Sequence, residues 1–162
     1  MKRPAILPII IATLALLTGC AHNDGDIGPL YGWWHLDTLT TARANDPATG
    51  APGDIEHTEY PDSIFWAFQS GIIEMERLLP HHSVDRRWGT WTRGNGRLML
   101  DFTHSDPANP PGTGRFEPLP ELHLPSNTLI DLKIEQLTDH DMVVSYADPA
   151  ATTLYIYYFS KW

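Results

Sequence analysis

Cysteine, basic side chains and long apolar segments are all scarce in this chain of 162 residues. Its single cysteine, Cys20, cannot close a disulfide within the chain or form the Cys-x-x-Cys pair of redox and zinc sites. Lysine and arginine number 11 against 20 aspartate and glutamate residues, and no basic run interrupts the excess of acid. Binding to nucleic acid needs basic patches that meet phosphates, so the composition argues against a nucleic-acid partner.

The one long apolar run lies near the start of the sequence. It covers residues 6–17, follows Lys2 and Arg3, and ends among small residues. A helix that spans a bilayer needs about 20 apolar residues, so this shorter run is typical of a secretory signal that is removed. We therefore expect residues 1–19 to be a signal peptide. Its removal leaves 143 residues and moves the formal charge from -9 to -11, because two basic side chains are lost.

The run ends in Leu-Thr-Gly-Cys at residues 17–20, which resembles the lipobox of bacterial lipoproteins. The resemblance implies cleavage before Cys20, lipid attachment to Cys20 and a short polar tether over residues 20–29. A lipidated cysteine carries two or more acyl chains, which anchor a protein stably where one does not. Ala21 is not acidic, which implies the outer membrane, with periplasmic and surface-facing orientations both open. An ordinary secretory signal with a chance cysteine is the alternative.

Alternation of apolar and polar residues with period two dominates the rest of the chain and predicts about eight strands. These segments are residues 30–39, 63–69, 72–79, 84–93, 98–102, 129–137, 142–146 and 152–162. No linker divides residues 30–162, so we expect one domain. Short turns such as Gly94-Asn95-Gly96 favour an antiparallel up-and-down meander. An eight-stranded barrel would eliminate its exposed edges, and a β-sandwich is the alternative because alternation does not distinguish the two.

Two long connections interrupt this regularity, at residues 40–62 and 104–127. Both contain prolines, which remove backbone donors and fix φ, so neither is expected to be a central strand. Loops of this length in compact domains are commonly binding loops, lids or disordered segments. Within the second connection, residues 119–124 could form one short helical turn.

The opening Gly32-Trp33-Trp34 resembles the Gly-x-Trp found near the start of barrels in the lipocalin and calycin group. In that group a cation from the last strand often lies over the tryptophan ring, and Lys161 could provide it for Trp34. The whole mature chain further resembles lipocalin-like lipoproteins of Bacteroidetes. The matching segments, in order, are residues 32–36, 88–98, 134–144 and 154–159. This resemblance implies an eight-stranded barrel that binds a small molecule.

Aromatic side chains are numerous for a small domain, with six Trp, six Tyr and five Phe. Such residues line apolar ligand cavities, but they also fill the interior of an eight-stranded barrel. The predicted ligand-binding residues are Trp34, Trp66, Phe68, Trp88 and Phe102. The leading interpretation is therefore an envelope protein that binds a small apolar or amphipathic ligand. The alternative is a non-enzymatic accessory subunit of an envelope complex, which contacts its partner through exposed aromatic residues and the Pro-rich loop.

Residues that would indicate catalysis or metal binding do not form recognised patterns. Glu74 and Glu76 are two apart on one strand, roughly 6.6 Å by the strand rise, and such neighbours rarely flank a scissile bond. No Gly-x-Ser-x-Gly turn is present. The candidate metal ligands, none of which has the spacing of a known site, are His81, His82, His104, Asp106 and His123. We therefore predict no enzymatic activity, no cofactor and no metal site.

Overall fold

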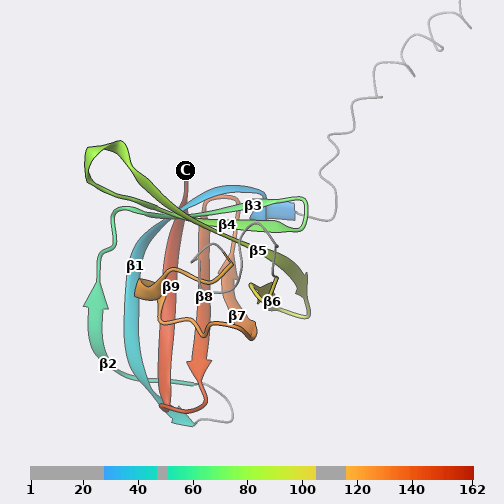
Figure 1. The fold of residues 1–162 in the computed structure, drawn as a ribbon. Coiled ribbons are helices and arrows are strands. Elements are labelled where there is room, and N and C mark those ends of the chain that lie inside the picture. The colour runs from blue at the N-terminus through green and yellow to red at the C-terminus, as the bar shows by residue number, and fades with distance from the viewer. Residues whose placement is uncertain (1–27, 47–50, 105–115) are drawn as a thin grey trace, which may run out of the picture.

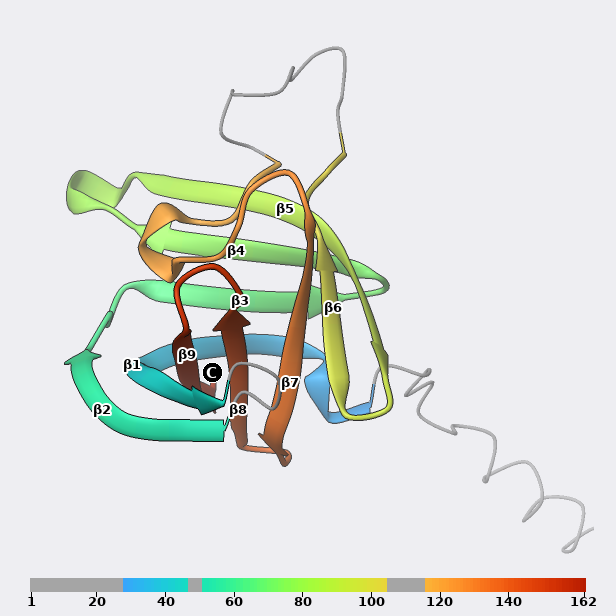
Figure 2. The same ribbon diagram turned by 90° about the horizontal axis from the view of Figure 1, so that it is seen from below.

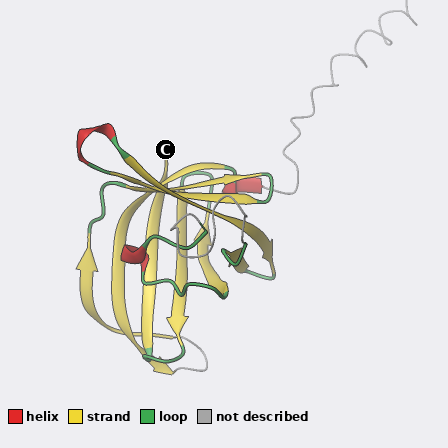
Figure 3. Ribbon diagram, viewed as in Figure 1, coloured by secondary structure: helices red, strands yellow, loops and turns green. Residues whose placement is uncertain are grey.

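The computed structural model describes residues 28–46, 51–104 and 116–162 (Figure 1). Its nine strands are β1 (Gly32–Asp46), β2 (Ala51–Glu59), β3 (Ile64–Gln69), β4 (Ile72–Leu78), β5 (Val84–Gly94), β6 (Arg97–Asp101), β7 (Leu129–Leu137), β8 (Asp141–Asp148) and β9 (Thr153–Lys161). Three single 3-10 turns accompany them: η1 (Gly28–Leu30), η2 (Pro80–His82) and η3 (Pro120–Leu122) (Figure 3). None of these described helices is long and apolar enough to cross a membrane. The predicted signal peptide, Cys20 and most of the tether lie outside the described residues.

Eight of the strands close into an antiparallel barrel. Each strand from β3 to β9 pairs with the next, and β9 returns to pair with β1, which also pairs with β3. The view in Figure 2 shows these strands surrounding a common interior. Closure leaves no free edge along most of the sheet, which stabilises an isolated all-β domain. The predicted up-and-down barrel is confirmed, and the β-sandwich alternative is wrong.

Strand β2 corrects the prediction that residues 40–62 form a long connection. Strand β1 continues to Asp46, and β2 pairs with its second half, from Leu39 onward, while β3 pairs with the first half, Gly32 to His35. Strands β2 and β3 both lie along the edge of β1 opposite β9. They follow one another there as the chain runs back antiparallel to β1. Most described side chains of β2 are exposed, which explains why this strand lacks apolar alternation. Backbone pairing with β1, rather than core burial, holds it.

A β-bulge in β1 keeps its apolar residues facing the interior. The pairing of β1 with β9 shifts between Leu36 and Thr38, which inserts Asp37 as an extra residue. An inserted residue inverts the alternation of faces beyond it. Leu36 and Leu39, three positions apart, therefore both lie buried in the core.

The barrel interior is filled by large side chains from every barrel strand. The largest fully buried ones include Trp34, Trp66, Tyr157, Phe68 and Phe102, each at most 1% exposed. Trp66 lies at the centre of an aromatic cluster, with ring centroids 4.7 Å from Phe159 and 5.9 Å from Tyr157. Burial of this much aromatic surface is the main source of stability in a domain without disulfides.

Residues 116–124, which we call the cap, cross one side of the barrel between β4 and β9 (Figure 2). Leu119, Leu122 and Leu124 of the cap are buried in the core cluster. The hydroxyl of Tyr157 on β9 donates a hydrogen bond to the carbonyl oxygen of Leu122 at 2.6 Å, inside the protein. The turn η3 confirms the helical turn predicted within residues 119–124. The cap is therefore part of the packed core rather than a loose loop.

An ion network fixes the cap to β4 and β5. Arg87 donates from Nε and Nη2 to the two carboxylate oxygens of Asp85, at 2.8 and 3.0 Å, and from Nη1 to Glu117 at 2.8 Å. Arg77 pairs with Asp85 at 3.2 Å and with Glu121 of the cap. The hydrogen bond from Arg87 is the main cause that lowers the pKa of Asp85. Both cap glutamates thus contact arginines of the barrel wall.

Near the start of β1, Lys161 and η1 enclose Trp34. The Lys161 Nζ lies 4.3 Å from the centroid of the Trp34 ring and donates to the carbonyl oxygens of Pro29 and Tyr31. The Trp34 indole donates to Leu30 at 2.8 Å. The predicted cation over Trp34 is confirmed. Burial lowers the pKa of Lys161, and the charge of Asp139 opposes that shift.

Candidate functional site: an aromatic cleft on the outer wall

Four of the five predicted ligand-binding residues lie inside the packed barrel. Trp34, Trp66, Phe68 and Phe102 all belong to the core cluster and contact other core side chains rather than a cleft wall. One polar atom there, Nε1 of Trp66, is buried and has no hydrogen-bond partner among the described residues. Their positions fit the interpretation that these aromatic residues fill the barrel.

Trp88 differs from the other four because it lies on the outer wall. Alternation along β5 points Arg87, Gly89 and Trp91 inward, with Gly89 and Trp91 buried, and leaves Trp88 on the opposite face at intermediate exposure. There it pairs in register with Glu74 of β4 and gives that carboxylate a side-chain hydrogen bond. Trp88 therefore does not share a site with the interior residues.

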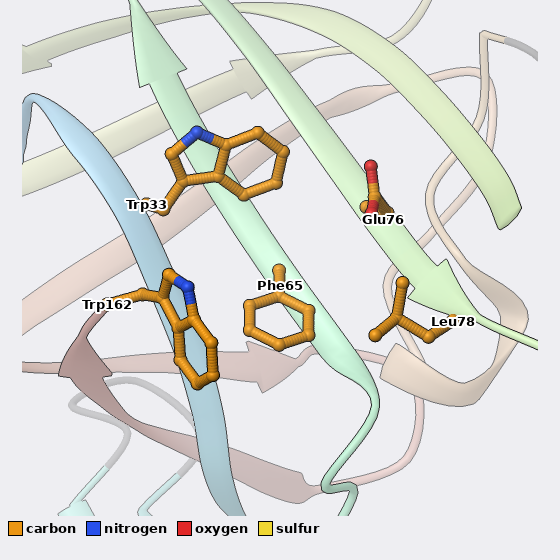
Figure 4. Close-up of a pocket in the computed structure, with 5 residues that line it drawn as sticks. All are labelled: Trp33, Phe65, Glu76, Leu78 and Trp162. Carbon is orange, nitrogen blue, oxygen red and sulfur yellow. The ribbon is translucent and has the colours of Figure 1, made fainter. Parts of the chain in front are cut away.

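A cleft on the outer wall is the strongest candidate for a functional site in the described part of the chain. Its volume is about 310 Å³, and five residues line it: Trp33, Phe65, Glu76, Leu78 and Trp162. Figure 4 shows Trp33, Phe65 and Trp162 on one side, with Glu76 and Leu78 across from them on β4. We call this the outer cleft. It joins apolar walls to a single carboxylate, which suits an amphipathic ligand.

Strand register brings these residues together from distant parts of the sequence. Across the outer face, one row of paired residues runs His35, Phe65, Glu76, Arg86, and the neighbouring row runs Trp33, Ala67, Glu74, Trp88. Side chains at paired positions lie about 4.5–5.5 Å apart at Cβ, so each row forms a continuous band of contacts. Each row thus combines aromatic side chains with one carboxylate of β4.

The three aromatic side chains of the outer cleft differ in exposure. Trp162 is 79% exposed and Trp33 36%, whereas Phe65 beneath them is 8% exposed. The Trp162 ring meets the Phe65 ring edge-on at 5.2 Å, and its backbone N–H donates to the carbonyl oxygen of Trp33 at 2.9 Å. Both tryptophan side chains are therefore accessible to a ligand, next to the buried ring of Phe65. Exposed aromatic groups gathered in this way commonly mark binding sites.

At the outer cleft, the carboxylates of β4 outnumber the arginine that pairs with them. Glu76 is only 7% exposed, and Arg86 donates from Nε to its Oε2 at 2.9 Å. The same Nε lies 3.3 Å from Oε1 of Glu74. Two carboxylates thus share one guanidinium. Burial is the main cause that raises the pKa of Glu74, and the charge of Arg86 opposes that shift.

His35 lies beside Phe65, its partner on the neighbouring strand. Its ring lies 5.0 Å from Phe65 and 6.1 Å from Trp162. Its Nδ1 is 2.7 Å from the Asp37 carboxylate and its Nε2 is 3.1 Å from the Asp62 carbonyl oxygen. Because both ring nitrogens are held by the protein, His35 positions the aromatic rings rather than facing the ligand.

The remaining histidine candidates are dispersed. His81 and His82 lie exposed in η2, His104 contacts the Thr90 hydroxyl at 3.2 Å, and His123 stacks on Tyr155 at 5.0 Å. Asp106 lies outside the described residues. Among the residues that the structure describes, no three His, Cys, Asp or Glu side chains are placed to hold a metal ion together. Near η2, a second hollow of about 420 Å³ shares Leu78 with the outer cleft, but turn residues form most of its wall.

Sequence reasoning missed the outer cleft because it assigned aromatic residues to the interior. The available signal was the adjacent pair Trp33 and Trp34, which must point to opposite faces of a strand. The same parity places Phe65 outside, between Ile64 and Trp66. Trp162 ends the predicted strand 152–162, but its place beside Trp33 depends on the pairing of the chain end with β1, which alternation alone does not give.

Comparison with known proteins identifies the fold. No protein-family model matches the chain, and no curated protein matches it. Among solved structures, a lipocalin-like protein from Bacteroides uniformis aligns with a TM-score of 0.52 and 19% identity, covering 83% of this chain and all of that one. This likeness establishes a lipocalin-like fold.

Two further solved structures align less well. An uncharacterized protein from Bacteroides eggerthii has a TM-score of 0.48 and 19% identity, over 82% of this chain and 99% of that one. A deswapped triple mutant of bovine odorant binding protein has a TM-score of 0.39 and 12% identity, over 83% and 75%. These TM-scores are too low to support an argument about this chain.

Proposed function

We propose that this protein is a lipid-anchored component of the outer membrane that binds a small amphipathic ligand in the outer cleft. The observation that carries the proposal is the cleft itself, in which three aromatic side chains lie across from Leu78 and the buried carboxylate of Glu76. Its volume lies near the lower end of the roughly 300–1,000 Å³ typical of ligand pockets, which suits a small molecule. Binding, rather than catalysis, is the activity that such a site supports.

The packed interior favours the outer cleft over the inside of the barrel. Core aromatic residues and the cap leucines already occupy the interior, and the arginines of β4 and β5 hold the cap in place. A ligand there would have to displace buried apolar surface and break charged contacts. A ligand in the outer cleft needs neither change, since Trp33, Leu78 and Trp162 are already exposed.

Native mass spectrometry of protein purified from its own host tests ligand binding. We expect a bound small molecule in the wild type and its loss in Trp33→Ala, because that change removes one aromatic wall. Ile55→Ala, which truncates an exposed residue of β2 outside the cleft, serves as the control and should retain the molecule. Equal retention by both variants, or an empty wild type, would contradict the proposal.

Crosslinking that instead captures a stoichiometric protein at Trp162 would favour an accessory subunit.

The lipid anchor makes a separate prediction at Cys20. Cys20→Ser should abolish incorporation of radiolabelled palmitate and release the protein from the membrane fraction, because serine cannot form the thioether. Fractionation and labelling of cells that express each form measure both effects. Ala21→Ser, a neighbouring small-residue change, should leave labelling intact. Unchanged membrane association of Cys20→Ser would exclude anchoring through this residue.

A further inference from the structure

The outer cleft also indicates the chemical class of its ligand, an inference that rests on the proposed function. We propose that it binds an organic cation, with a quaternary or substituted ammonium group held between the aromatic rings and the carboxylate of Glu76 on β4. The inference combines three features of the cleft: the ring faces, the excess of negative charge and the burial of that charge.

Ring faces are the first feature. Trp33 and Trp162 are exposed at the mouth of the cleft and Phe65 lies beside them, so an entering group meets three aromatic side chains, with Glu76 and Leu78 across from them. The faces of aromatic rings carry negative electrostatic potential and attract cations, tryptophan most strongly. Sites for quaternary ammonium groups in proteins are built from such rings, because the methyl groups contact the rings while the charge is attracted to them.

Negative charge is the second feature. Glu74 and Glu76 share the single guanidinium of Arg86, which leaves an excess of one carboxylate along the wall. Asp37 pairs separately with His35 on β1. Arg86 uses its Nε for both glutamates, and about half of its side chain is exposed. A second cation at the cleft would therefore complete the charge balance, whereas an anionic ligand would face Glu76.

Burial of these carboxylates is the third feature. Glu76 is almost fully buried although it lines the cleft. Charges removed from water interact more strongly with a partner, because the surrounding dielectric constant is lower. Burial is also the main cause that raises the pKa of Glu74, beside Glu76 on the same strand. A cation bound beside Glu76 would therefore interact with a carboxylate that is largely removed from water.

Choline and its uncharged carbon isostere, 3,3-dimethylbutan-1-ol, test the proposal, because the two molecules share shape and differ in charge. We expect the full mature protein to bind choline about tenfold more tightly than the isostere, in titrations at constant ionic strength. Glu76→Gln should remove most of this preference without weakening the isostere. Glu56→Gln on β2, which makes the same change in net charge away from the cleft, should keep it. Trp162→Leu, at an exposed position where folding is not at risk, should weaken choline several-fold.

The outcomes of these titrations separate the cation assignment from the proposed function. Equal affinity for choline and the isostere would overturn the cation assignment while leaving an amphipathic cleft in place. No binding of choline at any accessible concentration would also overturn it, and the proposed function would then depend on the molecule found by mass spectrometry. A choline preference that survives in both Glu76→Gln and Trp162→Leu would place the cation elsewhere on the protein.

Discussion

Replacement of Arg87 by methionine is expected to lower the free energy of unfolding by about 2 to 3 kcal/mol. The change leaves Asp85 and Glu117 without their main partner, and removing one member of a buried charged network costs about 3–5 kcal/mol. The expected loss is smaller because the Asp85 and Glu117 side chains keep 21% and 35% of their exposure to water. Urea unfolding followed by tryptophan fluorescence measures it.

Arg97→Met is the matched control. Arg97 pairs with Asp131 through a similar geometry, but both side chains are more than 40% exposed, so the loss should be at most about 1 kcal/mol. Equal losses in the two variants would contradict a structural role for the cap network.

Acid titration gives a second measure of the cap network. The hydrogen bond from Arg87 holds the pKa of Asp85 below its ordinary value of 3.8. Such a carboxylate stabilises the folded protein fully above that ordinary value, and its contribution is lost as pH falls through the lower folded pKa. Arg87→Met should therefore show a weaker loss of stability with acid below about pH 4 than the wild type shows.

Gly89→Ala is expected to destabilise the protein by about 2 to 3 kcal/mol, because an added methyl group has no space. A Cβ atom at this position would lie 2.7 Å from the carbonyl oxygen of Asp101 and 2.9 Å from the Phe102 ring. The oxygen belongs to the backbone and the ring is buried, so neither can move without disturbing the core. Thermal unfolding monitored by circular dichroism measures the shift.

Gly94→Ala controls for the intrinsic effect of replacing glycine in the same strand. No heavy atom lies within 4 Å of a Cβ built there, and Gly94 is not in the left-handed region. We expect a change within about 0.5 kcal/mol. A similar loss at both positions would mean that glycine is needed for reasons other than the contact with Phe102.

Most of the fold could be predicted because burial determines it. The segments with clear alternation, such as residues 129–137 with Ile130 and Leu132 inside, became barrel strands in the expected order. Strand β2 could not be predicted in this way because its side chains are mostly exposed and only its backbone pairing with β1 holds it. The packing of the cap could not be predicted either, because the pairing of Glu117 and Glu121 with arginines of β4 and β5 depends on tertiary contacts.

The candidate site was harder to predict than the fold. Aromatic composition suggested an interior cavity, but the same rings fill the barrel, and composition alone does not separate these outcomes. The outer cleft depends on cross-strand register, which sets Phe65 beside Glu76, and on the path of the chain after β9, which carries Trp162 over His35 and Phe65. Neither follows from local pattern.

The six tryptophan indoles give the most direct test of where a ligand binds. Trp33, Trp88 and Trp162 lie on the outer wall, and Trp34, Trp66 and Trp91 lie in the core, so the indole N–H signals in a ¹⁵N-correlated NMR spectrum report on both faces. During a choline titration we predict shifts at Trp33 and Trp162 with no change at Trp66, the interior donor without a partner. Shifts confined to Trp34, Trp66 and Trp91 would place the ligand inside the barrel and contradict the outer cleft.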